Sequence, residues 1–471
     1  MNEIITQVSD ALWTYLLIGV LVACGLWFTV RTRGVQFRMI GEMFRLLGDS
    51  AVKSVSGNGR EERGKKHISS FQAFCVSVAT RVGTGNLAGV ATAIMVGGPG
   101  AVFWMWVIAL IGAATAFVES TLAQLFKQRN KDSFIGGPAY YIQKGLHCRW
   151  MAVLFAILIT LTFGLSYNSI QSNTICASMQ SAFGWNPVVI GIVITVLTLF
   201  IVFGGIQRIA HVSSVLVPFM AVGYLIIALV VIVMNIGAVP HVLRLIVENA
   251  FGINQAAGGM LGSTILMGVK RGLFSNEAGE GSAPNVAATA SVSHPVKQGL
   301  VQSLGVFTDT LLVCSCTAFI ILISGTYNTS GLTGIQLTQS ALSHEIGGAG
   351  RYFLAVAIFL FAFSSIIGNY YYGEANIRFM TSNRKVLMLF RILTGGMVLF
   401  GALAGLDMVW AIGDLFMALL TICNLIAIVL LGKYAFRLLD DYRSQKRRGI
   451  KNPQFRKNTL PEIEKDIDGW E

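Results

Sequence analysis

The sequence predicts an all-α integral membrane protein with eleven transmembrane helices. First, 54% of the 471 residues are hydrophobic and only 12% are charged, whereas soluble domains have about 25% charged residues. Second, the apolar residues form runs, and about 20 such residues cross the hydrocarbon layer as a helix. Third, lysines and arginines concentrate in alternate connections between these runs, as expected if each run crosses the bilayer.

The first run, residues 11–30, is longer than a signal-peptide core and lacks a convincing cleavage site, so we predict a retained helix. Ten further runs are separated by polar or glycine-containing segments. They predict helices near residues 68–96, 100–126, 150–181, 187–204, 213–235, 256–292, 298–324, 351–378, 385–403 and 408–432.

The charge distribution fixes the predicted orientation. Of the 35 lysines and arginines, 29 lie in one set of alternate connections and the C-terminal tail, and the opposite connections hold only Arg244 and Arg351. Because cytoplasmic loops are rich in these residues, we expect the N-terminus outside and the C-terminus in the cytoplasm. The net charge of +12 is spread over loops and tail, so it does not indicate a nucleic-acid surface.

Apart from the first helix, the predicted helices divide into two sets of five, which begin on opposite sides of the membrane. This arrangement predicts an inverted repeat of residues 68–235 and 256–432. Residues 1–67 provide the extra helix and a basic cytoplasmic segment, 236–255 an extracellular connection, and 433–471 a basic cytoplasmic tail. The seven cysteines have no paired spacing and are interpreted as packing residues rather than disulfide or zinc partners.

The opening helix of each half is interrupted by glycine and polar residues, near 80–86 and 270–285. Such segments survive in a membrane only when buried in protein or lining a cavity. Where the first helix resumes, the amides of Gly83, Thr84 and Gly85 can bind a carboxylate, and the carbonyls before the break can bind a cation. The two breaks therefore indicate a midplane site for an amino-acid zwitterion and Na⁺.

Other polar residues of the predicted helices have two interpretations. Phe163, Tyr167 and Gln171 suit a pocket wall or ordinary helix packing. Ser364 and Ser365 place two hydroxyls on an apolar helix, where serines also bond back to the carbonyl four residues earlier.

Buried charges in the predicted helices need partners or a cavity. We expect Lys270 and Arg271 to form an ion-pair cluster with Glu277 and Glu280, whereas Arg81 is compatible with either Glu119 or Glu277.

Six stretches together resemble the alanine or glycine:cation symporter family, the sodium–alanine symporters of bacteria and archaea. They are residues 81–94, 97–106, 136–141, 271–279, 281–285 and 361–365. The resemblance implies a leucine-transporter-type core of two inverted five-helix repeats, with core helices 1 and 6 broken and one extra N-terminal helix.

The resemblance also implies specific site residues. Gly83, Thr84, Gly85 and Asn86 would bind the substrate carboxylate, and Phe274, Ser275, Asn276 and Gly279 would line the pocket beside Phe163, Tyr167, Gln171 and Asn369. The carbonyls of Ala79 and Val82, the hydroxyls of Ser364 and Ser365, and Asn86 would bind Na⁺. Two residues depart from the family pattern: Glu280 stands where methionine is frequent, and Asn369 where many members have tryptophan.

We therefore expect sodium-coupled uptake of a small neutral amino acid, alanine or glycine, across the bacterial inner membrane by alternating access. The expected partners are the amino acid, Na⁺ and membrane lipid, without nucleic acid or organic cofactor. The alternatives are a proton-coupled carrier, a carrier that prefers glutamine or serine, and an amino-acid-gated channel or sensor. An enzyme is not expected, because no nucleophile–base pair is recognisable.

Overall fold

The computed structural model describes residues 2–55, 68–130, 133–252 and 258–470. Most of these residues are helical, and within these ranges the strands are β1 Gln128–Asn130 and β2 Ser133–Ile135, which pair antiparallel. Arg60, Arg63, Lys65 and Lys66 of the predicted basic segment lie outside the described residues, as does the predicted boundary at 255/256.

Along the chain, shorter helices connect the long apolar ones. The helices are α1 Asn2–Leu12, η1 Trp13–Leu17, α2 Ile18–Arg31, α3 Val35–Arg38, α4 Ile40–Val55, α5 Ser70–Arg81, η2 Gly85–Gly89, α6 Val90–Gly97, α7 Ala101–Leu125, α8 Pro138–Gly145, α9 Arg149–Ile159, η3 Thr160–Tyr167, α10 Asn168–Phe183, α11 Pro187–Val202, α12 Gly205–Met234, η4 Ile236–Ala238, α13 Val239–Ala250, α14 Gly258–Asn276, α15 Ala283–Ala287, α16 Pro295–Val306, η5 Phe307–Cys314, α17 Ser315–Ser324, η6 Thr326–Asn328, α18 Gly334–Ile346, α19 Ala349–Met380, α20 Arg384–Leu403, α21 Leu406–Arg447, η7 Lys457–Thr459 and η8 Pro461–Asp466.

Eight helical stretches in the described part of the chain are long and apolar enough to cross a membrane. They are Thr6–Arg31, Ala101–Leu125, Arg149–Phe183, Arg208–Met234, Pro295–Ser324, Ala349–Met380, Arg384–Leu403 and Leu406–Arg447, and Gly85–Gly97 and Pro187–Val202 are shorter apolar helices. This supports a multi-pass membrane protein. The connecting helices α4, α8, α13 and α18 are not predicted from the sequence, because each lies outside the long apolar runs.

Both interruptions seen in the sequence are breaks in the backbone. Helix α5 begins at a capping box between Ser69 and Gln72 and ends at Arg81, and the helix resumes as η2 at Gly85. Helix α14 ends at Asn276 and α15 begins at Ala283. In between, Glu277 has φ 55°, a left-handed conformation that few residues other than glycine adopt.

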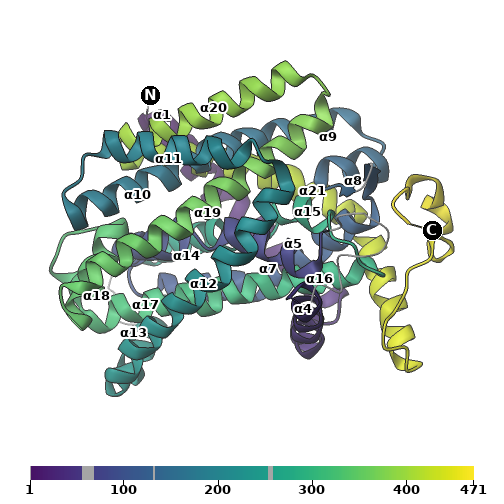
Figure 1. Ribbon diagram of the computed structural model, residues 1–471. Helices are drawn as coiled ribbons and strands as arrows, with labels where there is room; N and C mark the ends of the chain where they lie inside the picture. The colour runs from purple at the N-terminus through teal and green to yellow at the C-terminus, as the bar shows by residue number, and fades with distance from the viewer. Residues whose placement is uncertain (1, 56–67, 131–132, 253–257, 471) are drawn as a thin grey trace.

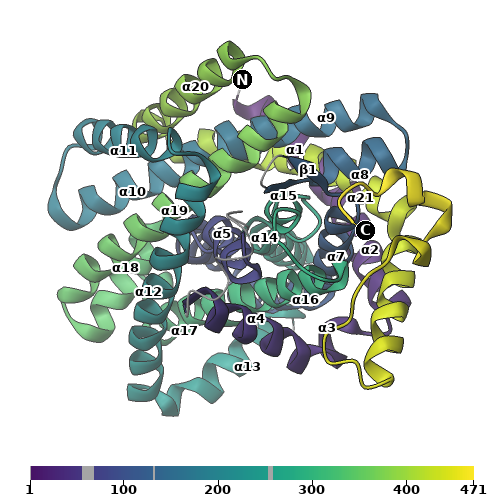
Figure 2. The same ribbon diagram turned by 45° about the vertical axis from the view of Figure 1, so that its right-hand side comes forward.

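The two broken helices lie in the middle of the bundle (Figures 1 and 2), where both views place α5, α7 and α14 inside the outer helices. Glycines allow α14 to approach α7 closely. A Cβ atom at Gly272 would lie 2.7 Å from Ile108 Cγ2, and one at Gly268 would lie 2.5 Å from the carbonyl oxygen of Ala101. Small residues at helix contacts are typical of packing within membranes.

The C-terminal residues pack back onto one end of the bundle, beside α8 (Figure 1). Helix α21 continues to Arg447, well beyond the predicted end of its apolar run. The following residues run across this end: the Phe455 amide donates to the Ser293 carbonyl at 2.8 Å, and Trp470 Nε1 donates to the Gln124 carbonyl at 2.9 Å. Part of the predicted basic tail is therefore an ordered, docked element.

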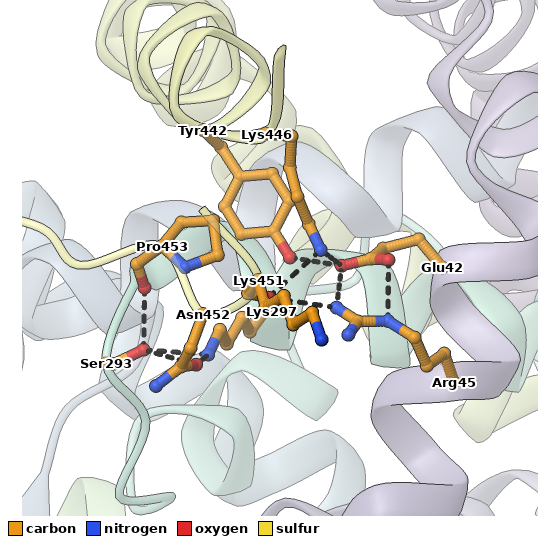
Figure 3. Close-up of polar contacts among 9 residues, drawn as sticks. All are labelled: Glu42, Arg45, Ser293, Lys297, Tyr442, Lys446, Lys451, Asn452 and Pro453. Atoms are coloured by element: carbon orange, nitrogen blue, oxygen red, sulfur yellow. Dashed lines mark hydrogen bonds and ion pairs between the residues drawn. The ribbon is translucent and has the colours of Figure 1, made fainter. Parts of the chain in front are cut away.

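The last turns of α21 are also joined to α4. Figure 3 shows the Glu42 carboxylate between Arg45 of its own helix and Tyr442 and Lys446 of α21. The Tyr442 hydroxyl donates to Glu42 Oε1 at 2.5 Å, and Lys446 Nζ lies 3.0 Å from the same oxygen. This contact connects two segments that are about 400 positions apart in the chain.

Candidate functional site

The first break directs its backbone amides at side-chain oxygens. The Gly83 N–H donates to Asn86 Oδ1 at 2.9 Å. The Thr84 N–H and hydroxyl both donate to Gln171 Oε1 of α10, at 3.0 and 2.7 Å. Thr84 and Asn86 are fully buried. An oxygen acceptor therefore already occupies the position in which a substrate carboxylate is expected from the sequence.

Three elements approach the glycines of this break closely. A Cβ atom at Gly83 would lie 2.3 Å from Ser365 Oγ of α19 and 3.0 Å from Gln171 Oε1. A Cβ atom at Gly85 would lie 3.0 Å from Phe274 Cδ1 and 3.2 Å from Ser275 Cα of α14. The glycines thus bring the first break into contact with α10, α14 and α19.

The hydroxyls of α19 meet the end of α5. Ser365 Oγ donates to the Ala79 carbonyl at 2.8 Å, and Ser364 Oγ lies 3.5 Å from the same oxygen. The Phe361 carbonyl also accepts from Ser364 Oγ at 2.8 Å and from Ser365 Oγ at 3.0 Å. Both hydroxyls therefore bond back within their own helix and also lie near the Ala79 carbonyl. Carbonyl and hydroxyl oxygens are suitable donors for a hard cation, and Val82 lies fully buried in the adjoining break.

Asp309 of η5 joins the two broken helices. Asn86 Nδ2 donates to Asp309 Oδ1 at 2.6 Å, and Ser275 Oγ donates to Asp309 Oδ2 at 2.7 Å. Thr310 Oγ1 adds a third hydrogen bond, at 2.9 Å. Asp309 is not among the site residues expected from the sequence, although an acid inside a long apolar helix is a signal that points to it.

Aromatic rings form one wall of the site. The ring centroids of Phe163 and Tyr167 are 4.6 Å apart, those of Tyr167 and Phe274 are 4.7 Å apart, and those of Phe274 and Trp410 are 4.7 Å apart. Such spacings are favourable for aromatic pairs. Phe163, Tyr167 and Phe274 are predicted pocket residues, whereas Trp410 of α21 is not identified from the sequence.

The second break is held by side chains from two neighbouring helices. Glu119 of α7 accepts hydrogen bonds from the amides of Gly279 and Gly281, at 3.3 and 3.2 Å. Asn424 Nδ2 of α21 donates to Glu119 Oε2 and to the Gly279 carbonyl, both at 2.9 Å. A Cβ atom at Gly279 would face Leu425 and Thr115, so this residue faces the packing helices. Asn276 Oδ1 caps the Ala278 amide at 3.0 Å.

The buried cations pair differently from the sequence expectation. Lys270 Nζ lies 2.9 Å from Asp414 Oδ2, and Arg271 binds both Asp414 oxygens at 3.1 and 2.9 Å. The predicted ion pairs of these two cations with Glu277 and Glu280 are therefore wrong. Both cations face α21 rather than the break that follows them in the chain. In the described residues Arg81 pairs with neither Glu119 nor Glu277, and its Nη1 donates to the Gln302 carbonyl at 3.2 Å.

Glu280 and Asn369 carry buried polar atoms without a hydrogen-bond partner in the described structure. The Tyr167 hydroxyl donates to Glu280 Oε2 over 3.4 Å, while Glu280 Oε1 has no hydrogen-bond partner in the described structure. Neither amide atom of Asn369 has such a partner. Glu280 is fully buried and Asn369 is 1% exposed.

Comparisons with known proteins agree with this architecture. The sequence profile of the sodium:alanine symporter family matches residues 1–457. The chain is 52% identical to the probable sodium/glutamine symporter GlnT of Bacillus subtilis, over 98% of this chain and 94% of that protein. It is 51% identical to the amino-acid carrier protein AlsT of the same organism, over 100% of this chain and 98% of that protein. The crystal structure of MhsT in complex with L-phenylalanine is similar in fold, with a TM-score of 0.56 at 14% identity over 85% of this chain and 93% of that chain.

Proposed function

The chain belongs to the sodium:alanine symporter family, and from this membership we propose that it carries a small neutral amino acid together with Na⁺ across a bacterial inner membrane. Alanine and glycine are the substrates implied by the family resemblance. Glutamine is the second candidate, because the relative GlnT is named as a glutamine symporter. The transport cycle requires no covalent chemistry.

The substrate carboxylate is proposed to bind at the first break, and the Thr84–Gln171 contact is the observation that carries this assignment. The Thr84 amide and hydroxyl both donate to a single oxygen, Gln171 Oε1. A carboxylate oxygen can take this place when the Gln171 side chain turns aside. Gln171 then offers its amide N–H groups to the bound carboxylate. The dipole of the helix that resumes at Gly85 favours the same negative charge.

Sodium is proposed to bind on the other side of the same break. The Ala79 and Val82 carbonyls and the Ser364 and Ser365 hydroxyls would supply oxygen ligands, with Asn86 as a further ligand. The contact between Ser365 and Ala79 at 2.8 Å supports the proposal. Each ligand would stabilise the same broken conformation of the backbone, so that binding of one favours binding of the other.

The proposed topology has eleven membrane helices, with the N-terminus outside and the C-terminus in the cytoplasm. Residues 1–67 form the added helix and basic segment, and 433–471 the cytoplasmic tail. Residues 68–235 and 256–432 are proposed as inverted five-helix repeats joined by 236–255. Breaks in the opening helix of each half support this division, since paired broken helices are typical of transporters built from repeats. Alternating access would follow from rocking of the broken-helix bundle.

Reconstitution into liposomes tests the function. Purified protein should accumulate labelled alanine, glycine or glutamine when Na⁺ is higher outside, and accumulation should stop when the Na⁺ gradient is removed. Accumulation driven by a pH gradient without Na⁺ would identify a proton-coupled carrier instead. Binding without accumulation, or currents above carrier turnover, would identify a sensor or channel.

A further inference from the structure

Glu280 and Asn369 are an unusual feature of a buried site that binds a neutral amino acid. One carboxylate oxygen of Glu280 and both amide atoms of Asn369 lack hydrogen-bond partners within the described structure, although both residues are buried. Buried polar atoms in proteins are nearly always paired, because an unpaired group loses its hydrogen bonds to water without replacement. A substrate with both a hydrogen-bond donor and an acceptor could pair with these three atoms.

The packing of α19 against η3 and α10 places Asn369 at the level of Tyr167. Gly164 of η3 lies beside Gly373 of α19, because a Cβ atom at Gly164 would be 3.5 Å from Gly373 Cα. Farther along the same two segments, Gln171 of α10 and Ser365 of α19 lie at one height, because both face Gly83. Tyr167 and Asn369 lie about midway between these two points on their respective segments.

The helical face of Asn369 is fixed by its neighbours. Ser365, Asn369 and Tyr372 are spaced four and three residues apart and so share one face of α19. Ser365 contacts the Ala79 carbonyl, and the Tyr372 hydroxyl lies 3.1 Å from Thr80 Oγ1. The Tyr372 ring also packs against Phe163, with 5.4 Å between centroids. Asn369 therefore faces the space between α5 and η3, where the Tyr167 hydroxyl reaches Glu280.

Tyr167 and Asn369 therefore lie about one helical turn, roughly 5.4 Å, from the proposed carboxylate position at Thr84 and Gln171. A side chain with two methylene groups spans such a distance, whereas the methyl group of alanine does not. The substrate atoms that reach Glu280 and Asn369 must then include both a hydrogen-bond donor and an acceptor.

We propose that Glu280 and Asn369 form a side-chain subsite for a primary carboxamide, so that the transporter selects glutamine over alanine. The amide NH₂ of the substrate donates to Glu280 Oε1, and its carbonyl accepts from Asn369 Nδ2. This assignment rests on the proposed function and names its substrate. An acidic side chain is disfavoured, because Glu277 and Glu119 already place negative charge at the same break.

The discrimination should be large, since alanine leaves the polar atoms of the subsite unpaired. Sites built to hydrogen-bond a substrate group reject analogues that lack it far more strongly than apolar pockets reject a missing methylene. We expect the kcat/KM of uptake to be at least about tenfold higher for glutamine than for alanine, equivalent to one or more hydrogen bonds.

The experiment compares labelled glutamine and alanine uptake in proteoliposomes under one Na⁺ gradient. Glu280→Met and Asn369→Ala should each lower the glutamine-to-alanine ratio of kcat/KM by about tenfold, mainly through the KM for glutamine. In both variants the kcat/KM for alanine should change less than that for glutamine, because alanine does not reach the subsite. Glu374→Gln is the matched control, since Glu374 lies on the same helix and pairs with Arg378 at 2.6 Å. It should leave the ratio unchanged.

Two results would overturn the subsite. One is a wild-type protein that transports alanine as efficiently as glutamine. The other is an unchanged substrate ratio in Glu280→Met and Asn369→Ala. If the wild type shows no sodium-dependent uptake of either amino acid, the proposed function itself fails. Should Glu280→Met not fold, the isosteric Glu280→Gln tests the same point through the glutamine-induced rise in unfolding temperature, which should shrink relative to that of the wild type.

Discussion

The side-chain oxygen of Gln171 lies 2.7 Å from the Thr84 hydroxyl and accepts the Thr84 backbone N–H as well, at 3.0 Å. This single contact joins α10 to the first break and fills the proposed carboxylate position. If the substrate carboxylate binds there as proposed, it and the Gln171–Thr84 contact exclude each other. The Gln171 side chain would then compete with the substrate and keep the buried Thr84 amide paired until the substrate arrives.

Gln171→Glu should keep the side chain at position 171 bound to Thr84 and so block the proposed carboxylate position. A carboxylate of the same shape accepts the same two hydrogen bonds more strongly and repels the incoming substrate carboxylate. We expect the KM for uptake to rise by at least about tenfold, which corresponds to roughly 1.4 kcal/mol. Measured uptake kinetics in proteoliposomes provide the check. Gln180→Glu, at an exposed position of the same helix, should leave the KM unchanged.

Gly83→Ala should abolish transport while the protein still inserts into the membrane. The added Cβ atom would lie 2.3 Å from Ser365 Oγ and 3.0 Å from Gln171 Oε1, so it separates the first break from both α19 and α10. Displacements of about 1 Å in a preorganised site cost on the order of 100-fold in rate. Gly223→Ala on α12 adds the same methyl group where no atom lies within 4 Å and should transport normally. Normal uptake by Gly83→Ala would contradict this role.

Ser365→Ala should weaken the dependence on Na⁺ more than it lowers expression. The change removes a hydroxyl that contacts the Ala79 carbonyl at 2.8 Å and that is proposed to coordinate the cation. Loss of one such interaction costs about 1–2 kcal/mol, so the Na⁺ concentration for half-maximal uptake should rise roughly tenfold. Thr195→Ala removes a hydroxyl that bonds back to the Gly191 carbonyl on α11 and is the control. An unchanged Na⁺ dependence in Ser365→Ala would remove this residue from the proposed site.

Local sequence signals predicted the broken helices well. Gly83 and Gly85 stand among polar residues in an otherwise apolar run, and such a pattern is incompatible with a lipid-facing helix. The structure accordingly interrupts the helix between Arg81 and Gly85. The positions of the apolar helices also follow from composition, because a run of hydrophobic residues must be buried in either lipid or protein.

Partners between distant helices could not be predicted in the same way. Lys270 and Arg271 precede Glu277 and Glu280 in the chain, but their partner Asp414 lies about 140 residues away. The choice depends on which face of α14 meets α21, and sequence spacing does not specify that face. Asp309 is similar, since its contacts with Asn86 and Ser275 arise only when three helices pack together.

Stability should depend on the ionisation of Glu42, which joins α4 to the end of α21. Burial by itself raises the pKa of Glu42, but hydrogen bonds from Arg45, Tyr442 and Lys446 outweigh it and lower the pKa from 4.5 to about 2. The unfolded chain takes up its proton near the higher value. The stabilisation is therefore complete above about pH 4.5 and is lost as the pH falls toward 2.

Glu42→Gln should consequently lower the unfolding temperature of the purified protein at pH 7, and the difference from the wild type should shrink between pH 4.5 and 2. The exposed Asp49 of the same helix provides a control through Asp49→Asn. A difference that stays constant over this pH range would show that Glu42 acts by packing rather than by charge.

Asp309→Asn separates the charge of this buried acid from its role in joining helices. The asparagine oxygen can accept from Asn86, and its NH₂ group can donate to the hydroxyls of Ser275 and Thr310, so the contacts between helices are largely kept. The negative charge is lost, and a nearby cation loses the attraction of an ionised group in a medium of low dielectric constant. We expect the apparent affinity for Na⁺ to fall by roughly tenfold with an unfolding temperature near that of the wild type, whereas Asp309→Ala should lower both. Wild-type uptake that is driven by a pH gradient and disappears in Asp309→Asn would instead assign this carboxylate to proton coupling.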